Sequence, residues 1–325
     1  MYDLVIIGGG AASQAAAMYA HGKQIDFLLI SDRIGGRVEP IAAADFDYSL
    51  GNILIHFDYP DAEEEERQLI GSSAVRLFER QLSRQVGRVL SDQVMRVEKL
   101  GQHFLVQTLQ AGPIAAATVI VATGAAPRRL TGVPGAELVQ GLGHGRTSRA
   151  ADVADKSVAV IGDSEQALYS AADLASRARQ VALVLPNAPS SDSVPLSLVQ
   201  RRPNIELFPG FQVHEVRPLD EGCELLLVCG EQRLNLIVDA AFADLGCEPA
   251  SSLVGHMART SADGFIQVDR GFATSVSGLF AAGDVTHPEG EQVLAAIGDG
   301  ARAARSAHFY LLTRPRSRMV GAAGR

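Results

Sequence analysis

The feature that most constrains this chain is a glycine triplet between a buried strand and a helix near its beginning. Leu4–Ile7 is a short apolar run rich in β-branched residues, which is typical of a parallel strand buried on both faces. Gly8-Gly9-Gly10 follows at once, and Ala11–Ala20 continues as a strong helix former. In such a unit the glycines let the backbone approach a pyrophosphate, and the first helical N–H groups receive its negative charge. The stretch therefore predicts a dinucleotide-binding site.

Length, charge and cysteine content narrow the class of protein. The 325 residues are enough for about two domains. The net charge of −8 argues against nucleic acid as a main partner, because phosphate contacts need clustered Lys and Arg. No apolar run approaches the roughly 18 residues that span a bilayer, and we expect no signal peptide, because the chain enters a strand without a basic region or a cleavage site. Three cysteines are too few for a secreted disulfide scaffold, so we expect a cytoplasmic protein without a metal site.

A second unit of the same kind begins in the middle of the chain. Val158–Ile161 is its strand, Gly162 follows, and a helix is expected from about Ser164 to Ala178. Further strands are expected at residues 26–30, 118–122, 181–185 and 279–284, strand-rich segments at 86–112 and 205–239, and a long helix at about 292–312.

In other stretches the apolar residues do not recur at the spacing of a helix or a strand. We interpret Glu39–Ile70, which carries an acidic run, as a solvated loop that leads into a helix at about 72–84. A lid or a partner-docking surface is the alternative for this segment. Pro127 and Pro134 mark one linker and Pro249 another.

Four motifs stand in a fixed order along the chain. They are GGGAAS at Gly8, VIVATGA ending at Ala125, VAVIGDSEQA at Val158 and LFAAGDV ending at Val285. With them the chain resembles the low-molecular-weight thioredoxin reductases, flavoproteins of the pyridine-nucleotide disulfide oxidoreductase group, over nearly its whole length. The resemblance implies an α/β fold with two Rossmann-like, three-layer ββα dinucleotide-binding domains. It also implies a homodimer in which residues 1–125 and 248–325 form a discontinuous FAD-binding domain around an inserted nicotinamide-type domain at 126–247.

The resemblance places FAD on these motifs and on residues that follow the second strand. Gly8 and Gly10 would meet the pyrophosphate, and Asp284 would bond its end or the ribityl chain. An acid about 20 residues past the glycines commonly holds the ribose, and Ser31 and Asp32 stand near that place. The predicted FAD-binding residues are Gly8, Gly10, Ala11, Ala12, Ser31, Asp32, Gly35, Gly36, Arg37, Ala122, Thr123, Gly124, Gly283, Asp284, Gln292 and Val293.

The second glycine motif departs from the family pattern. Ser164 stands where the backbone must approach a pyrophosphate, and Asp163 and Glu165 add negative charge beside it. Leu185-Pro186-Asn187 replaces the arginines that in the family hold the 2′-phosphate of NADPH, and no acid for an NAD ribose stands there. Tight NADPH binding is therefore not expected, while a second FAD in the central domain stays open.

The redox-active cysteine pair of the family is absent. Its position falls on Gly145–Ser148, which contains no thiol. Cys223 and Cys229 lie on one predicted strand whose ends are roughly 20 Å apart, whereas a disulfide needs Cα atoms within about 7 Å. Cys247 is expected in a loop as an ordinary small residue, with a reactive thiol as the alternative. No catalytic residue is assigned, and His287 is interpreted as a solvated loop histidine.

These observations lead to competing functional hypotheses. The leading one is an FAD-dependent oxidoreductase that is not driven by NADPH and exchanges electrons with a ferredoxin-like protein carrier or a thiol or disulfide substrate. The alternatives are a redox-sensing flavin-binding module without significant turnover, and a diflavin enzyme with a second FAD in the central domain.

Overall fold

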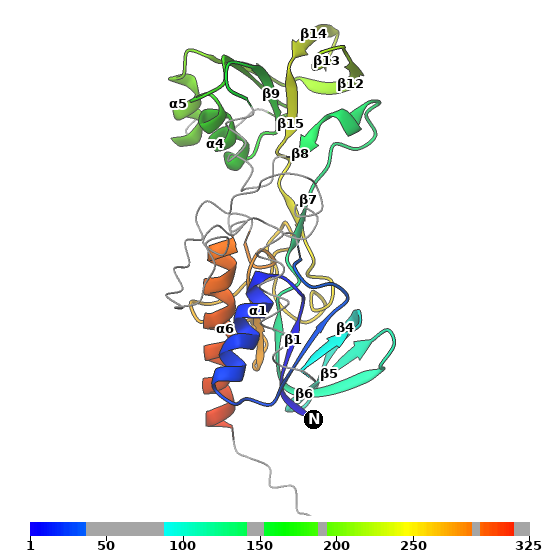
Figure 1. The fold of residues 1–325 in the computed structure, drawn as a ribbon, viewed down its shortest axis with the longest axis vertical. Coiled ribbons are helices and arrows are strands. Elements are labelled where there is room, and N and C mark those ends of the chain that lie inside the picture. The colour runs from blue at the N-terminus through cyan, green and yellow to red at the C-terminus, as the bar shows by residue number, and fades with distance from the viewer. Residues whose placement is uncertain (37–87, 142–152, 188–193, 288–292, 315–325) are drawn as a thin grey trace, which may run out of the picture.

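The computed structural model describes residues 1–36, 88–141, 153–187, 194–287 and 293–314 (Figure 1). The first sheet has the strand order β3-β2-β1-β6-β5-β4, with β17 paired to β6. Its strands are β1 (Tyr2–Ile7), β2 (Phe27–Ser31), β3 (Val89–Ser91), β4 (Val94–Leu100), β5 (His103–Thr108), β6 (Pro113–Val121) and β17 (Leu279–Ala281). β1, β2, β3, β6 and β17 run parallel, and β4 and β5 extend β6 as an antiparallel meander.

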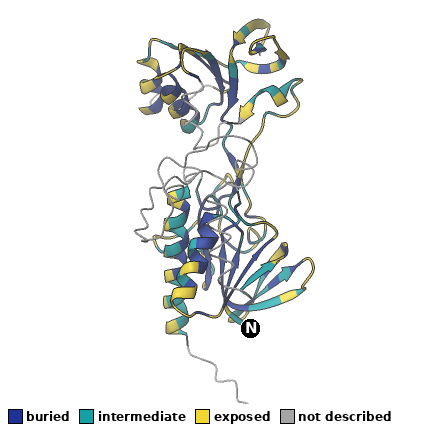
Figure 2. Cartoon of the chain, viewed as in Figure 1, coloured by how far each residue is buried: buried dark blue, intermediate teal, exposed yellow. Residues whose placement is uncertain are grey.

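Successive side chains of β1 point alternately to the two faces of the first sheet, and both faces are packed. Leu4 and Ile6 join one buried cluster with helices α1 (Ala11–Gly22) and α6 (Val293–Thr313). Val5 and Ile7 join another with side chains of β4 and β5. Because side chains alternate across a strand, a helical layer, a parallel sheet and a meander stack as three layers around this strand. In Figure 2 the central strands of the first sheet are largely buried, while the meander and the outer edge of α6 carry exposed residues.

The second sheet repeats this arrangement. All its strands are parallel, in the order β11-β10-β9-β15-β8. They are β8 (Gln140–Gly141), β9 (Ser157–Ile161), β10 (Gln180–Leu185), β11 (Ile205–Pro209) and β15 (Ala240–Ala243), and the 3-10 helix η2 (Ala136–Leu138) precedes β8. Val158 and Val160 of β9 pack toward α4 (Glu165–Leu174) and α5 (Val194–Gln200). Ala159 and Ile161 pack toward the meander β12 (Gln212–Pro218), β13 (Cys223–Cys229) and β14 (Gln232–Val238). The fold class with two Rossmann-like units is confirmed.

A two-stranded ribbon lies between the two sheets (Figure 1). β7 (Ala125–Pro127) pairs antiparallel with β16 (Cys247–Pro249), and the N–H of Arg128 donates to the carbonyl of Gly246 at 2.9 Å. The prediction of a loop at Cys247 was wrong, because Cys247 begins β16. Three-residue strands that end in proline, as both of these do, carry no local strand signal, because each is fixed by a partner far away in the sequence.

Several predictions fall outside the described residues. These are the segment Glu39–Ile70, the helix at 72–84, the cysteine-pair position Gly145–Ser148, and the site residues Arg37 and Gln292. Within the described ranges, the separation of Cys223 and Cys229 along β13 is confirmed, and none of the three cysteines forms a disulfide. No helix among the described residues is long and apolar enough to cross a membrane.

Asp92 joins two turns of the first sheet. It lies between β3 and β4, is 3% exposed, and accepts hydrogen bonds from the N–H groups of Gln93, Gln110 and Ala111 at 2.7, 3.1 and 2.8 Å. Burial by itself would raise the pKa of the Asp92 carboxyl. These hydrogen bonds and one with Thr108 lower the pKa by more than burial raises it, so the pKa lies below its usual value.

We expect Asp92→Asn to lower the thermal midpoint by several degrees at pH 7, because the Asn NH₂ group repels these donors. A carboxyl with a depressed folded-state pKa stabilises the fold above its unfolded pKa of about 3.9, and the effect is lost as the pH falls through the folded pKa. The difference between variant and wild type should therefore shrink in acid, as thermal scans across pH would show. An equal difference at pH 7 and pH 3 would contradict this role.

Candidate functional site

The glycine turn after β1 is shaped by contact with the end of β6. Gly8 has φ +123°, and a Cβ atom there would lie 2.2 Å from the carbonyl oxygen of Ala122. The N–H of Ala122 in turn donates to the carbonyl of Ile7 at 2.8 Å. Only glycine fits such a backbone angle and approach. A Cβ on Gly9 would likewise lie 1.9 Å from the carbonyl oxygen of Arg33. Because Gly9 has no side chain, the loop after β2 can pack directly against the turn.

The N-terminus of α1 is not covered by the residues that the structure describes. Gly10 is its N-cap residue, with no side-chain cap and no acidic residue in the first turn. Among the described residues, no atom lies within 4 Å of the position that a Cβ on Gly10 would take. The first N–H groups of a helix have no partner inside the helix, and they carry the positive end of its dipole. This cradle fits an anion such as a pyrophosphate.

Three further predicted segments converge on the start of α1. The N–H of Gly35 donates to the carbonyl of Gly9 at 2.9 Å, and a Cβ on Gly36 would lie 2.9 Å from the Cα of Gly10. From the last strand, a Cβ on Gly283 would lie 3.0 Å from the Cβ of Ala12. Asp284 follows directly. The glycine turn, the loop after β2, the end of β6 and the end of β17 therefore meet at one place, as the motifs predict.

The remaining predicted residues border this place with different roles. Ser31 ends β2, and its hydroxyl donates to the carbonyl of Arg33 at 2.7 Å, while Asp32 beside it is exposed. Thr123 donates to the carbonyl of Ala250 at 2.7 Å, and Gly124 has φ +74° with open space at its Cβ position. Ala11 is the buried first residue of α1, and Val293 is the first residue of α6.

The second motif has the same backbone geometry as the first. Gly162 follows β9 with φ +154°, and a Cβ there would lie 2.1 Å from the carbonyl oxygen of Asp244, which follows β15. The side chain of Asp244 is buried and accepts a hydrogen bond from the Ser170 hydroxyl at 2.8 Å. The two glycines therefore hold equivalent turns, but Asp244 brings a carboxylate where Ala122 brings a methyl group.

The N-terminus of α4 is closed by the chain's own side chains. Ser164 is its N-cap, and its hydroxyl accepts a hydrogen bond from the N–H of Ala167 at 3.1 Å. The Asp163 carboxylate accepts from the backbone N–H and side-chain Nδ2 of Asn187 at 3.1 and 2.5 Å. Glu165 adds an acid in the first turn. Capping and negative charge offset the field that would attract a phosphate to this terminus.

The other candidate side chains are partnered or buried. His287, predicted to be a solvated loop histidine, places its Nε2 3.2 Å from a carboxylate oxygen of Asp299, whose side chain is 13% exposed. That prediction missed the partner because Asp299 lies on α6, 12 residues away. Cys223 is buried, and burial raises the pKa of its thiol, which disfavours the reactive thiolate.

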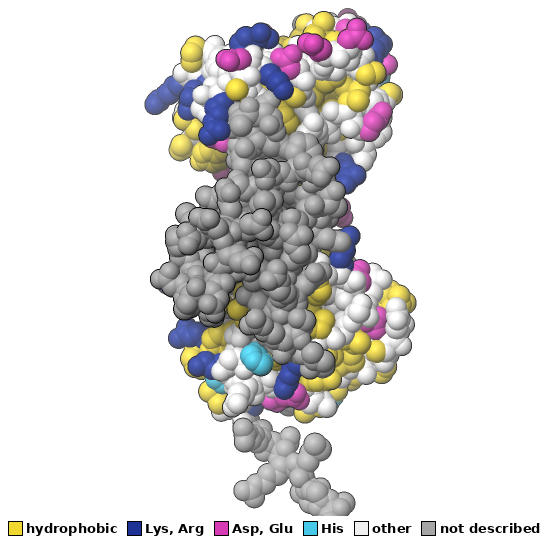
Figure 3. Space-filling view, viewed as in Figure 1, with side chains coloured by type: hydrophobic (Ala, Val, Ile, Leu, Met, Phe, Trp, Pro, Cys, Tyr) yellow, Lys and Arg dark blue, Asp and Glu magenta, His cyan; other side chains and the backbone are white. Residues whose placement is uncertain are grey.

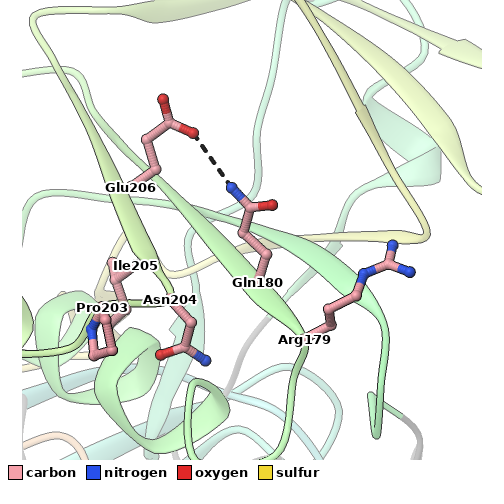
Figure 4. Close-up of a pocket in the computed structure, with 6 residues that line it drawn as sticks. All are labelled: Arg179, Gln180, Pro203, Asn204, Ile205 and Glu206. Carbon is pink, nitrogen blue, oxygen red and sulfur yellow. Dashed lines mark hydrogen bonds between the residues drawn. The ribbon is translucent and has the colours of Figure 1, made fainter.

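A pocket of about 510 Å³ lies on the second sheet. It is lined by Arg179, Gln180, Pro203, Asn204, Ile205 and Glu206 (Figure 4). Gln180 pairs with Ser157 at the amino end of the sheet, opposite the edge at Gly162. Ligands of parallel sheets bind outside the carboxyl ends of the strands. The pocket is therefore not part of the candidate site. Figure 3 shows that acidic and basic side chains are mixed on the surface of the upper part of the molecule, which holds the second sheet.

Sequence reasoning missed two residues of the site, Gly9 and Gln14. Gln14 is buried in α1, and its Nε2 donates to the carbonyl of Gly9 at 2.9 Å. The available signal was a lone amide in a helix otherwise rich in alanine.

Comparisons with known proteins agree with this geometry. A family model described as pyridine nucleotide-disulphide oxidoreductase matches residues 2–300. A component of the alkyl hydroperoxide reductase of Staphylococcus aureus strain NCTC 8325 is 28% identical over 317 residues, which cover 96% of this chain and 59% of that protein. The chain thus spans about three fifths of the length of the curated relatives that it matches.

Two solved structures share the fold. Thioredoxin reductase from Streptococcus pyogenes MGAS5005 superposes with a TM-score of 0.75 at 24% identity, covering 97% of this chain and 99% of that one. Thioredoxin reductase from Giardia duodenalis gives 0.76 at 21% identity, covering 96% and 99%.

Proposed function

The chain belongs to the pyridine nucleotide-disulphide oxidoreductase family, and from that premise we propose an FAD-dependent oxidoreductase that is not driven by NADPH. The observation that carries the proposal is the contrast between two equivalent helix termini. At α1 the N-cap Gly10 has no side-chain cap, the first turn has no acidic residue, and none of the described residues occupies the Cβ position of Gly10. At α4 the same place is capped by Ser164 and bordered by Asp163 and Glu165. One terminus fits a pyrophosphate and the other does not.

FAD would be held where the glycine segments converge. The N–H groups at the start of α1 would bind the pyrophosphate, and the loops at Gly35–Gly36, Thr123–Gly124 and Gly283–Asp284 would border the remainder. When bound, FAD supplies reversible electron transfer, whereas the chain supplies binding, orientation and electrostatics. We assign this site to a discontinuous domain of residues 1–125 and 248–325, and the α4 terminus to an inserted domain at 126–247. The ribbon of β7 and β16, at both proposed boundaries, supports this division.

The absence of an NADPH route is tested by an anaerobic titration of the flavin-loaded protein. We expect that adding NADPH or NADH leaves the flavin absorbance near 450 nm unchanged over minutes, because the α4 terminus offers no phosphate site. Dithionite serves as the positive control for a reducible flavin. Rapid bleaching by micromolar NADPH would contradict the proposal.

The electron partner is proposed by chemical class. Without a dithiol among the matched motifs, we propose exchange with a ferredoxin-like protein carrier or with a small thiol or disulfide, by a homodimer in the cytoplasm. Steady-state assays with reduced ferredoxin, dithiols and disulfides should show turnover well above that of free FAD with one of them. Turnover with none of these partners would instead support a redox-sensing module.

A further inference from the structure

The last turns of α1 and α6 lie side by side, away from the glycine turn. A Cβ on Gly300 would lie 1.9 Å from the carbonyl oxygen of Ala12, and further along both helices the ring centroids of Tyr19 and His308 are 6.3 Å apart. The two helices therefore run parallel, and their C-terminal ends form one surface, which we call the helix-end surface. Because a helix of 12 residues is roughly 18 Å long, this surface is remote from the N-terminus of α1.

The helix-end surface carries basic side chains that lie over aromatic rings. On α1, the Nζ of Lys23 lies 6.0 Å from the centroid of the Tyr19 ring. On α6, the rings of His308 and Phe309 stack with centroids 6.1 Å apart, and the guanidinium of Arg305 lies 4.9 Å from the centroid of Phe309. With the contact between Tyr19 and His308, these side chains form a continuous run from Lys23 to Arg305 across both helices.

Large apolar side chains are exposed beside this run. Met18 on α1 is 46% exposed, and Phe309 and Leu312 on α6 are 49% and 65% exposed. Residues three or four apart share a helix face, so Arg305, Phe309 and Leu312 lie in one row. Figure 2 shows exposed residues at the lower ends of both helices, and in Figure 3 basic and hydrophobic side chains lie next to one another along that edge. Exposed apolar side chains gathered in this way mark an interaction surface.

The charge of this surface is opposite to that of the whole chain. The net charge of the chain is −8, yet Asp299 is the only acidic residue in the sequences of α1 and α6. Its side chain is 13% exposed and pairs with His287. Residues 314–325, which follow α6 in the sequence, contain four arginines and no acid. A second copy of this chain would bring the same positive face and be repelled, so the charge favours an anionic partner.

We propose that the helix-end surface docks the protein on an anionic phospholipid bilayer. Lys23 and Arg305 would meet the lipid phosphates, and Phe309 and Leu312 would enter the boundary between headgroups and acyl chains. The long side chains of Lys and Arg keep their charges at headgroup level while the rings beneath them leave water.

A bilayer matches the helix-end surface better than an acidic protein does. It offers negative charge and hydrocarbon together, and it needs no groove that fits its shape. An electron carrier bound here would also be remote from the proposed FAD site, at the other end of α1. Docking on a membrane uses none of the residues proposed to bind FAD, so the two proposals stand independently.

Cosedimentation with lipid vesicles tests this proposal on the full-length chain as purified. One set of vesicles is pure phosphatidylcholine, and in the other set phosphatidylglycerol replaces one third of it. We expect wild type to bind the anionic vesicles at least about tenfold more tightly at low salt, since each Lys or Arg near such a surface contributes about fivefold. Salt at about 0.5 M should remove most of this difference by screening the charges.

Arg305→Glu and Leu312→Ser each remove one of the two interactions. Arg305→Glu should weaken binding to the anionic vesicles at least about tenfold, and Leu312→Ser should weaken it several-fold through lost apolar burial. The matched controls lie on β14, where Arg233 is exposed and Ile237 is 64% exposed. Arg233→Glu and Ile237→Ser should bind as wild type does.

Each alternative occupant gives a different result. Wild type that binds neither kind of vesicle, or both equally, would overturn the proposal, and so would undiminished binding by Arg305→Glu. A loss by Arg305→Glu without any loss by Leu312→Ser would overturn the bilayer in favour of an acidic protein. If sedimentation velocity showed a dimer that either variant dissociates, the helix-end surface would belong to a second copy of the chain and the proposal would be wrong.

Discussion

Replacing Gly10 with aspartate is expected to weaken FAD binding by at least about 100-fold, or about 2.7 kcal/mol, without destabilising the flavin-free chain. Gly10 has φ −82° and ψ −173°, which any residue adopts, and its Cβ position is open. An aspartate there would cap α1 and complement its dipole, adding a few tenths to about 1 kcal/mol of stability. The same carboxylate would occupy the place proposed for the pyrophosphate. Affinity and stability should therefore change in opposite directions.

The measurement pairs flavin titration with thermal unfolding of the flavin-free protein. Gly162→Ala is a useful contrast, because a Cβ there would collide with the carbonyl of Asp244 and lower stability without touching the α1 terminus. If Gly10→Asp bound FAD as tightly as wild type, the pyrophosphate would lie elsewhere.

Alanine substitutions at two glycines of α6 should have opposite effects on stability. Gly300 is buried, and a Cβ there would lie 1.9 Å from the carbonyl oxygen of Ala12 on α1. Gly300→Ala should therefore cost about 1 to 3 kcal/mol, because the two helices must separate. The displacement reaches Ala12 in the first turn of α1, so FAD affinity should fall too.

Gly298 provides the matched control on the same helix. It is exposed, and a Cβ there would meet no atom within 4 Å. Gly298→Ala should gain up to about 1 kcal/mol, since alanine is the better helix former. Urea unfolding of the flavin-free variants measures both changes. A gain in stability at both positions would show that helix propensity, not the contact of α1 with α6, governs this helix.

Local sequence signals were sufficient for the elements that carry the fold. The apolar runs at β1, β6, β9 and β10 predict buried parallel strands, and the structure places them there. Alternation along Leu4–Ile7 then determines which face meets the helices and which the meander. These features were predictable because each depends on residues adjacent in the chain.

Features that depend on distant partners were not predictable from local pattern. The strand at Cys247 was predicted as a loop, because it is defined by pairing with Pro127, far away in the sequence. From the sequence, the motif at Gly162 differs from the family pattern by Ser164 and its acidic neighbours. The structure adds that Ser164 caps the helix and that the Asp163 carboxylate pairs with Asn187. Asn187 stands 24 residues beyond Asp163, so only the fold reveals that it completes the closure.

We propose that the chain has one dinucleotide site, at the start of α1, and that the α4 terminus takes none. This claim is tested most directly by the ratio of flavin to protein, measured by absorbance after the FAD-saturated chain is freed of unbound flavin and denatured. We predict about one FAD per chain. A ratio near two would place a second flavin in the central domain and contradict the claim, and a ratio near zero would contradict the site at Gly10.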